Sequence, residues 1–550
     1  MFYFLYLILF YIFLFLVGRG LLIALEKISN KKNFYDSKNV FNIKLFTFYP
    51  IIALFYIGNL TFIINFFTKI NSELFTVHLF IFILLNINKK FQIELNFYNL
   101  VLFFSLFFIL SLSSYTTGFG YDAGLYHLNF QKILQSEKII FGLANFHSRF
   151  GFSSIYDYIG VVFWLKNNLI ALHYLNLTFI VFFYQSIYQV FFNTKNISFK
   201  IGSLSIILLG VLDNFGFNGG KNGYIEIEGI TKYDTPFGIL FFIGFYMATT
   251  IIFEKRNTKL EFFLIILIST FSLQMRPLGA LLFILFLILL FQKNITKIKL
   301  INESLPFIVL TFFWIIKNLI MSGCFIYPVK FLCIEALPWH YSIIVKNETL
   351  DITNSLVAYN LGENIFQWFK IWENDNNYNA STILNFFITC ILIIISSKTL
   401  TKFKNLFREK FFIFSFLLIC SLVWLTNAPD FRFAIGIVLS ISFFLPISKT
   451  AIYRKKVFNN LKVLFIILIS LSAFALPRFD NYVSFFENPI ENPVLLAPEV
   501  KYQARLSGFG LEPLDTNERC WIAIECTPKY SIPVTKTKQY SYTFFHLLNK

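Results

Sequence analysis

The sequence FYFLYLILFYIFLFLVGRGLLIA, residues 2–24, sets the architecture of this chain, and its only charged residue is Arg19. It is long enough to cross a bilayer as a helix, which takes about 20 apolar residues. The first 17 residues have neither a basic start nor a small-residue cleavage site, so we expect a retained helix and not a cleaved signal peptide.

Similar apolar runs recur to about residue 476. Hydrophobic residues make up 57% of the chain and charged residues 14%, which is far from the composition of soluble globular proteins. The sequence therefore predicts an all-α, polytopic integral membrane protein with about 14 transmembrane helices. The expected spans are 2–24, 45–67, 75–88, 98–113, 168–191, 201–213, 236–253, 262–275, 278–292, 304–321, 381–396, 411–427, 433–448 and 462–476.

The distribution of basic residues explains the net charge of +17. Lys and Arg cluster in short connections beside the expected spans, as cytoplasmic loops do. This pattern sets membrane topology and attracts anionic lipid, and it argues against a nucleic-acid partner. Both termini are then expected outside the cytoplasm. The basic connections are 27–44, 89–90, 195–200, 255–259, 293–299, 398–410 and 449–462.

The chain then divides into four parts: N-terminal transmembrane helices (1–113), an outer catalytic-type loop (114–167), a transmembrane core (168–476) and an outer tail (477–550). The core carries two further outer loops, 214–235 and 322–380. The tail holds seven of the 15 prolines, too many for a long helix. It keeps aromatic and apolar residues, so we expect an ordered lid or a small irregular domain.

The six cysteines are consistent with this topology. Cys390 and Cys420 fall inside expected spans, whereas the other four lie in outer segments. An even number on the oxidising side predicts the disulfides Cys324–Cys333 and Cys520–Cys526, and four unrelated thiols are the alternative.

The most reactive-looking string is Tyr121-Asp122-Ala123-Gly124-Leu125-Tyr126-His127, just after an apolar helix. Apolar residues at helical spacing predict an amphipathic helix over 121–140, lying in the membrane interface. Asp122 would begin this helix, where the helix dipole favours an ionised carboxylate that suits a general base. The alternative is that Asp122 is simply an N-cap.

Several residues are candidates for substrate binding. Arginine binds phosphate with two hydrogen bonds and keeps its charge, so outer arginines near a carboxylate suit a lipid-phosphate substrate. For Arg432 the alternative is an ion pair with Asp430, and for Arg276 it is extension alone to the membrane surface. Lys317 is expected to extend to the membrane surface or, as the alternative, to contact the same phosphate. Asp213 and, more weakly, Asp157 are further carboxylates. The substrate-binding candidates are Tyr121, Tyr126, His127, His147, Arg149, Asp213, Arg276 and Arg432.

No metal site is predicted, although a divalent metal is compatible with the sequence. The spacing of Asp122, His127 and His147 fits no strong ligand pattern. The chain also has no nucleotide-binding glycine loop and no serine nucleophile elbow.

Six pieces of sequence carry a resemblance: GFGYDAGLYHLNFQ, GLANFHSRFGFSS, LQMRPLG, SGCFIYP, APDFRF and CWIAIECTP. With an Asp in an outer loop after a span, the chain resembles the GT-C superfamily of polytopic glycosyltransferases that use polyprenyl-phosphate sugars. Within that group it looks similar to uncharacterised bacterial membrane proteins of surface-polysaccharide clusters. The resemblance implies that Asp122 takes the position of the catalytic base.

The expected function is therefore transfer of a sugar from a polyprenyl-phosphate donor to a lipid-linked or surface glycan. Asp122 would deprotonate the acceptor, Arg276 and Arg432 would hold the donor phosphate, and the anomeric centre would be inverted. The active side would face the periplasm or exterior of the cytoplasmic membrane. The alternatives are a flippase or transporter of a lipid-linked saccharide, or a glycan polymerase or ligase.

Overall fold

The chain is mostly helical in its computed structural model. Apolar segments form helices because a helix satisfies its backbone polar groups internally, as hydrocarbon surroundings require. The structure describes residues 2–29, 39–87, 97–115, 117–166, 168–215, 225, 227–254, 258–290, 297–355, 407–427, 430–447, 479–487, 495–506, 508–514, 519–528 and 531–548.

Five helices are long and apolar enough to cross a membrane, and they indicate a multi-pass membrane protein. The apolar stretches are Tyr3–Ile28, Leu45–Asn65, Ile170–Asn193, Asp234–Glu254 and Ser304–Ser322. They belong to α1 (Phe2–Ser29), η1 with α2 (Leu45–Phe48, Tyr49–Asn65), α8 (Ile170–Asn193), α10 (Asp234–Glu254) and α13 (Lys297–Ser322).

Further apolar helices accompany these five. The predicted spans 381–396 and 462–476 lie outside the described residues, and a helix occupies each of the other predicted ranges. Not all of these helices have the length and hydropathy of a membrane span, so the total of 14 stays a prediction. The additional helices are α3 (Ser72–Leu84), α4 (Phe97–Ser113), α9 (Ile197–Phe215), α11 (Lys259–Met275), α12 (Gly279–Leu290), α17 (Phe407–Asn427) and α18 (Phe431–Ile447).

The central helix of the bundle is α10. Of its apolar stretch, 94% is buried, and it packs against α8, α11, α12 and α18. By contrast, only 33% of the corresponding stretch of α13 is buried, and Leu305 and Phe312 there are exposed. Large apolar side chains on the outside of an apolar helix suit contact with lipid.

The segment between α4 and α8 folds into short helical pieces instead of one interfacial helix. The expected helix over 121–140 starts as a π-helical turn and ends at Ser136, and its polar Asn129 and Gln131 are as buried as its apolar residues. It is therefore enclosed by protein on both faces. The pieces are η2 (Ala123–His127), α5 (Leu128–Ser136), α6 (Leu143–Phe146), η3 (Ser148–Phe152), α7 (Ile155–Gly160) and η4 (Val161–Phe163).

The remaining elements are η5 (Lys330–Leu332), α14 (Ser342–Ser355), α20 (Phe479–Glu487) and six short strands. The strands form three antiparallel pairs: β1 (Asn39–Val40) with β2 (Ile43–Lys44), β3 (Tyr502–Ala504) with β4 (Leu511–Pro513), and β5 (Val534–Gln539) with β6 (Tyr542–Leu547). The last pair docks on the 114–167 segment, where Phe545 N–H donates to the Phe141 carbonyl (3.0 Å).

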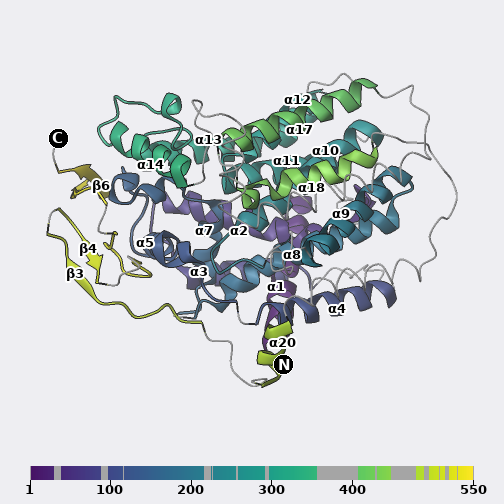
Figure 1. The fold of residues 1–550 in the computed structure, drawn as a ribbon, viewed down its shortest axis with the longest axis horizontal. Coiled ribbons are helices and arrows are strands. Elements are labelled where there is room, and N and C mark those ends of the chain that lie inside the picture. The colour runs from purple at the N-terminus through teal and green to yellow at the C-terminus, as the bar shows by residue number, and fades with distance from the viewer. Residues whose placement is uncertain are drawn as a thin grey trace.

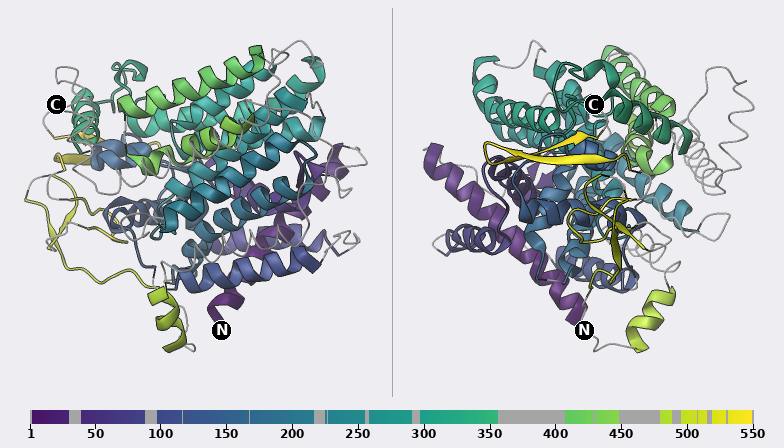
Figure 2. Two further views of the ribbon diagram at one scale, coloured as in Figure 1. Left: turned by 45° about the vertical axis from the view of Figure 1, so that its right-hand side comes forward. Right: turned by 90° about the vertical axis from the view of Figure 1, so that its left-hand side faces the viewer.

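The short helices of the 114–167 segment, α14 and the C-terminal strands gather at one end of the bundle (Figure 1). Figure 1 shows α5, α14, β3, β4 and β6 together there, beyond the long helices. Figure 2 shows the same grouping from two other directions, with the yellow C-terminal strands crossing that end. Segments from the first third and the last tenth of the chain therefore form one surface.

Candidate functional site

Asp122 lies at this end, immediately before the π-helical turn. Its backbone is helical (φ −65°, ψ −20°), and its side chain makes no capping hydrogen bond. Asp122 therefore stands at the N-cap position of η2, but its side chain does not cap the turn. Within the described ranges its carboxylate has neither a hydrogen bond nor an ion-pair partner, although it is half-buried. A carboxylate without a structural partner is available for chemistry.

Two tyrosines, the half-buried Tyr126 and the buried Tyr233, link Asp122 to Arg276 electrostatically. Burial raises the pKa of Tyr126 well above 10; the Asp122 charge raises it further, while Arg149 and Arg276 oppose the shift. Burial likewise raises the pKa of Tyr233 to about 12, with Arg276 opposing and Asp122 adding to the rise. Both hydroxyls therefore stay protonated and lie within the electrostatic reach of one carboxylate and one guanidinium.

Arg276 follows α11 and is held by an ion pair with Asp234, the first residue of α10. Its guanidinium carbon lies 5.0 Å from the centre of the Tyr233 ring and 4.5 Å from that of Phe433. Burial lowers the pKa of Arg276, but an arginine remains charged at any physiological pH. Arg276 therefore does not extend alone to a membrane surface.

Arg432 reaches the same place from α18. Its Nε atom lies 3.0 Å from Asp430 Oδ2, so the local ion pair forms. Its guanidinium carbon is 4.7 Å from the Phe433 ring centre, and its charge contributes to lowering the pKa of Arg276. Two arginines far apart in sequence thus share one aromatic ring, each with a carboxylate partner of its own.

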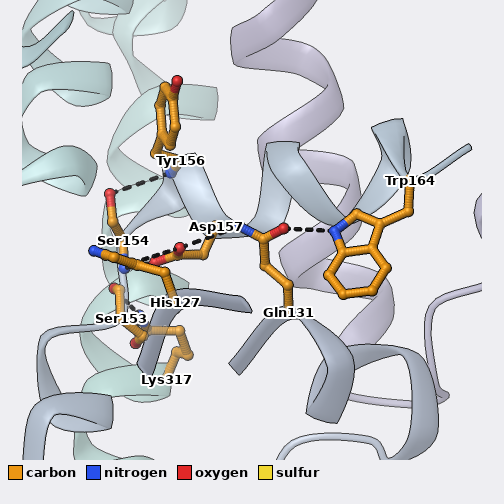
Figure 3. Close-up of polar contacts among 8 residues, drawn as sticks. All are labelled: His127, Gln131, Ser153, Ser154, Tyr156, Asp157, Trp164 and Lys317. Carbon is orange, nitrogen blue, oxygen red and sulfur yellow. Dashed lines mark hydrogen bonds and ion pairs between the residues drawn. The ribbon is translucent and has the colours of Figure 1, made fainter. Parts of the chain in front are cut away.

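A second carboxylate, Asp157, forms a buried pair with His127. His127 Nδ1 lies 2.9 Å from Asp157 Oδ1, and both side chains are buried. The backbone N–H of Ser154 donates to Asp157 Oδ2 (3.3 Å) in a capping box that begins α7. Figure 3 shows these groups and Gln131 converging on Asp157.

This pair orients the imidazole as a carboxylate orients a catalytic histidine. Asp157 occupies Nδ1, and the described residues offer no hydrogen bond to Nε2. The sequence ranked Asp157 low, although Ser154 and Asp157 have the spacing of a capping box. That spacing signals a helix start but gives no sign that a histidine 30 residues earlier completes the pair.

His147 and Arg149 lie beside the same cluster. Burial and the charge of Arg149 lower the pKa of His147 to about 3, so its imidazole is neutral. The His147 Nδ1 accepts a hydrogen bond from the Arg149 backbone N–H (3.2 Å). Arg149 Nε in turn lies 3.0 Å from Glu348 Oε1, which ties the segment to α14.

Lys317 differs from its prediction. Its side chain is fully buried and donates to the carbonyl (3.0 Å) and the hydroxyl (2.7 Å) of Ser153 (Figure 3). It therefore does not extend to the membrane surface, but fastens α13 to the segment before α7. Asp213 belongs to α9, and its side chain lies outside the described part of the structure.

The tail brings residues that sequence reasoning did not select. The Arg519 guanidinium carbon lies 4.6 Å from the centre of the Tyr121 ring, which is itself 53% exposed. Trp521 packs on Gly124 and donates its backbone N–H to the Gly124 carbonyl (2.7 Å). The only signal in the sequence was that CWIAIECTP is one of the pieces carrying the resemblance.

Both expected disulfides are present in the structure, Cys324–Cys333 and Cys520–Cys526. Cys324 and Cys333 also form, with His340, the one metal-ligand-like group among the described residues. Their sulfur atoms are bonded to each other and offer no thiolates, so this group does not fit a structural metal ion.

The chain belongs to the family described as a domain of unknown function (DUF8201), whose model matches residues 1–439. The matched range includes Asp122, Asp157, Arg276 and Arg432 but ends before the tail. No curated protein and no solved structure matches the chain.

Proposed function

We propose that this member of the DUF8201 family is an integral-membrane glycosyltransferase. It transfers a sugar from a polyprenyl-phosphate donor to a hydroxyl of a lipid-linked or surface glycan. The observation that carries the proposal is the Asp122 carboxylate, which has no hydrogen-bond or ion-pair partner among the described residues and lies beside a cluster of arginines and tyrosines. The resemblance of the motif segment to the GT-C superfamily supplies the substrate class.

The reaction divides between a base and an anion site. Asp122 takes the proton of the acceptor hydroxyl, whose oxygen bonds to the anomeric carbon as the carbon–oxygen bond to phosphate breaks. The electron pair of that bond leaves with the polyprenyl phosphate, and the anomeric centre is inverted. The phosphate then needs positive charge and hydrogen-bond donors, which the protonated Tyr126 and Arg276 supply.

The proposed location is the outer face of the cytoplasmic membrane. The basic connections predict that the 114–167 segment and the tail share the non-cytoplasmic side. Cys520–Cys526 in the tail and Cys324–Cys333 in the expected outer loop 322–380 support the same side, because disulfides persist in oxidising compartments. A lipid-linked donor would approach from the bilayer, beside the apolar helices.

The test is turnover by the purified full-length protein in lipid nanodiscs. Polyprenyl-phosphate sugars and glycan acceptors are supplied, and the released polyprenyl phosphate is measured by mass spectrometry. Asp122→Asn keeps the shape and removes the base, so turnover should fall by about 10²- to 10⁴-fold. The control is Asp480→Asn, which removes an exposed carboxylate from α20 and should leave turnover unchanged.

Folding of each variant is checked by its elution as a monodisperse peak and by retention of both disulfides. Unchanged turnover in folded Asp122→Asn protein would remove Asp122 from the reaction. Movement of intact lipid-linked saccharide across the bilayer, with no release of polyprenyl phosphate, would instead favour the flippase alternative.

A further inference from the structure

We propose that Arg519 of the C-terminal tail binds the phosphate of the lipid-linked donor and so completes the site from outside the family-matched region. The ligand's identity rests on the proposed function. The position of Arg519 rests on the structure alone. The segment 519–526, closed by the Cys520–Cys526 disulfide, is called the tail loop below.

The tail loop is docked directly on the turn that carries Asp122. The Trp521 N–H donates to the Gly124 carbonyl at 2.7 Å, and the Asn129 amide donates to the Ala523 carbonyl. The Trp521 ring also packs edge-on against Phe119, with ring centres 5.3 Å apart. These contacts fix the loop from both sides of residues 121–124.

Arg519 is therefore placed against the motif and not in open solvent. Its guanidinium carbon is 4.6 Å from the Tyr121 ring centre and 5.8 Å from that of Trp521. Its Cδ atom lies 3.0 Å from the position that a Cβ on Gly124 would occupy. Its side chain thus lies beside both residues that flank the Asp122–Ala123 pair.

Among Arg149, Arg276, Arg432 and Arg519, Arg519 alone has no ion pair with a described residue. Arg149 is paired with Glu348, Arg276 with Asp234 and Arg432 with Asp430. Within the described ranges, Arg519 has no ion pair or hydrogen bond; its Nε atom, like those of Arg276 and Arg432, is buried without a hydrogen-bond partner. A buried guanidinium nitrogen without a partner is costly, so an anion there would be favoured.

This arrangement assigns different roles to the arginines. Each of the three paired guanidiniums has a carboxylate beside it, which offsets part of the charge that Arg276 brings to the phosphate, and the Arg149 and Arg276 pairs also join separate segments. Arg519 offers a charge that no described carboxylate neutralises, together with the forked donors that fit a phosphate. It lies on a loop that is held by backbone contacts, so its placement does not depend on the ligand.

The experiment compares binding of polyprenyl phosphate with binding of the uncharged polyprenol of equal length, using full-length protein in nanodiscs. Wild-type protein should prefer the phosphate by tenfold or more. Arg519→Gln should lose about tenfold in affinity for the phosphate and keep its affinity for the alcohol, while Arg519→Lys should fall between them.

The matched control is Lys501→Gln, which removes an exposed positive charge from the same tail and should bind as wild type does. Retention of the Cys520–Cys526 disulfide shows that the loop is still closed in each variant. Equal phosphate affinity in wild type and Arg519→Gln would overturn the proposal. So would a wild-type protein that does not distinguish phosphate from alcohol.

Failure of this inference is distinguishable from failure of the proposed function. If turnover depends on Asp122 but not on Arg519, and Arg519→Gln keeps its phosphate affinity, only the role of Arg519 is refuted. If Arg519→Gln loses affinity for the phosphate but no form of the protein shows turnover, the phosphate site is supported and the transferase activity is refuted.

Discussion

Replacement of Gly124 by alanine tests whether the tail loop is seated as the structure shows. A Cβ there would lie 2.8 Å and 2.9 Å from two carbons of the Trp521 ring, closer than carbon atoms pack. Overfilling of this kind costs about 1–3 kcal/mol, and a displaced loop also loses the 2.7 Å hydrogen bond from Trp521 to Gly124. Within the helical turn itself, alanine is more stable than glycine by roughly 0.5–1 kcal/mol. The turn should therefore stay folded, and only the docking of the tail loop should weaken.

The expected result is faster hydrogen exchange in the tail loop. A cost of about 1–3 kcal/mol corresponds to a roughly 5- to 150-fold larger open population, since 1.4 kcal/mol is a factor of ten. Hydrogen–deuterium exchange of peptides from 519–528 measures this directly, with peptides from α10 as the internal reference. Gly118→Ala is the control, because nothing lies within 4 Å of its added Cβ. Equal exchange in Gly124→Ala and Gly118→Ala would refute the docking of the loop on the motif.

Two further predictions concern pH and topology. His147 has a folded pKa of about 3, below its unfolded value of 6.5, so the unfolded chain binds the extra proton and stability should fall as pH drops from 6.5 towards 3. Between pH 7 and pH 5, the melting temperature should therefore fall less in His147→Phe than in wild type. Identical falls would show that His147 does not cause the loss of stability in acid. For topology, Leu506, which is fully exposed in the tail, and Lys259, exposed at the start of α11, are each replaced by cysteine. A membrane-impermeant maleimide should label the Leu506→Cys protein on intact cells and the Lys259→Cys protein only after lysis, and the reverse pattern would invert the orientation and move the site to the cytoplasm.

The turnover of Asp122→Asn and the phosphate affinity of Arg519→Gln test the proposed reaction and the proposed phosphate site. The three structural tests above need no substrate. They can therefore fail or succeed whatever reaction the protein performs.

The sequence alone determined that the chain is helical and apolar. Hydrophobic runs such as residues 2–24 repeat along it, and local composition is enough to make a helix wherever a run is long and free of charge. The sequence also drew attention to Asp122, because a carboxylate directly after an apolar run is visible without a fold. The helix expected over 121–140 ends at Ser136. It is also not interfacial, because Asn129 is buried against the tail and Gln131 against α7, contacts that only the fold supplies.

Only the tertiary structure decided which groups meet. His127 pairs with Asp157, Arg276 with Asp234, and Arg519 lies on Tyr121, although 30 to almost 400 residues separate the partners. Such contacts follow from how helices pack and how the tail returns over the first outer segment, and no local pattern encodes them. A side chain's charge can be read from the sequence, but whether that charge is neutralised depends on the neighbour that folding supplies. For this reason only the fold showed that the Arg519 guanidinium has no partner among the described residues.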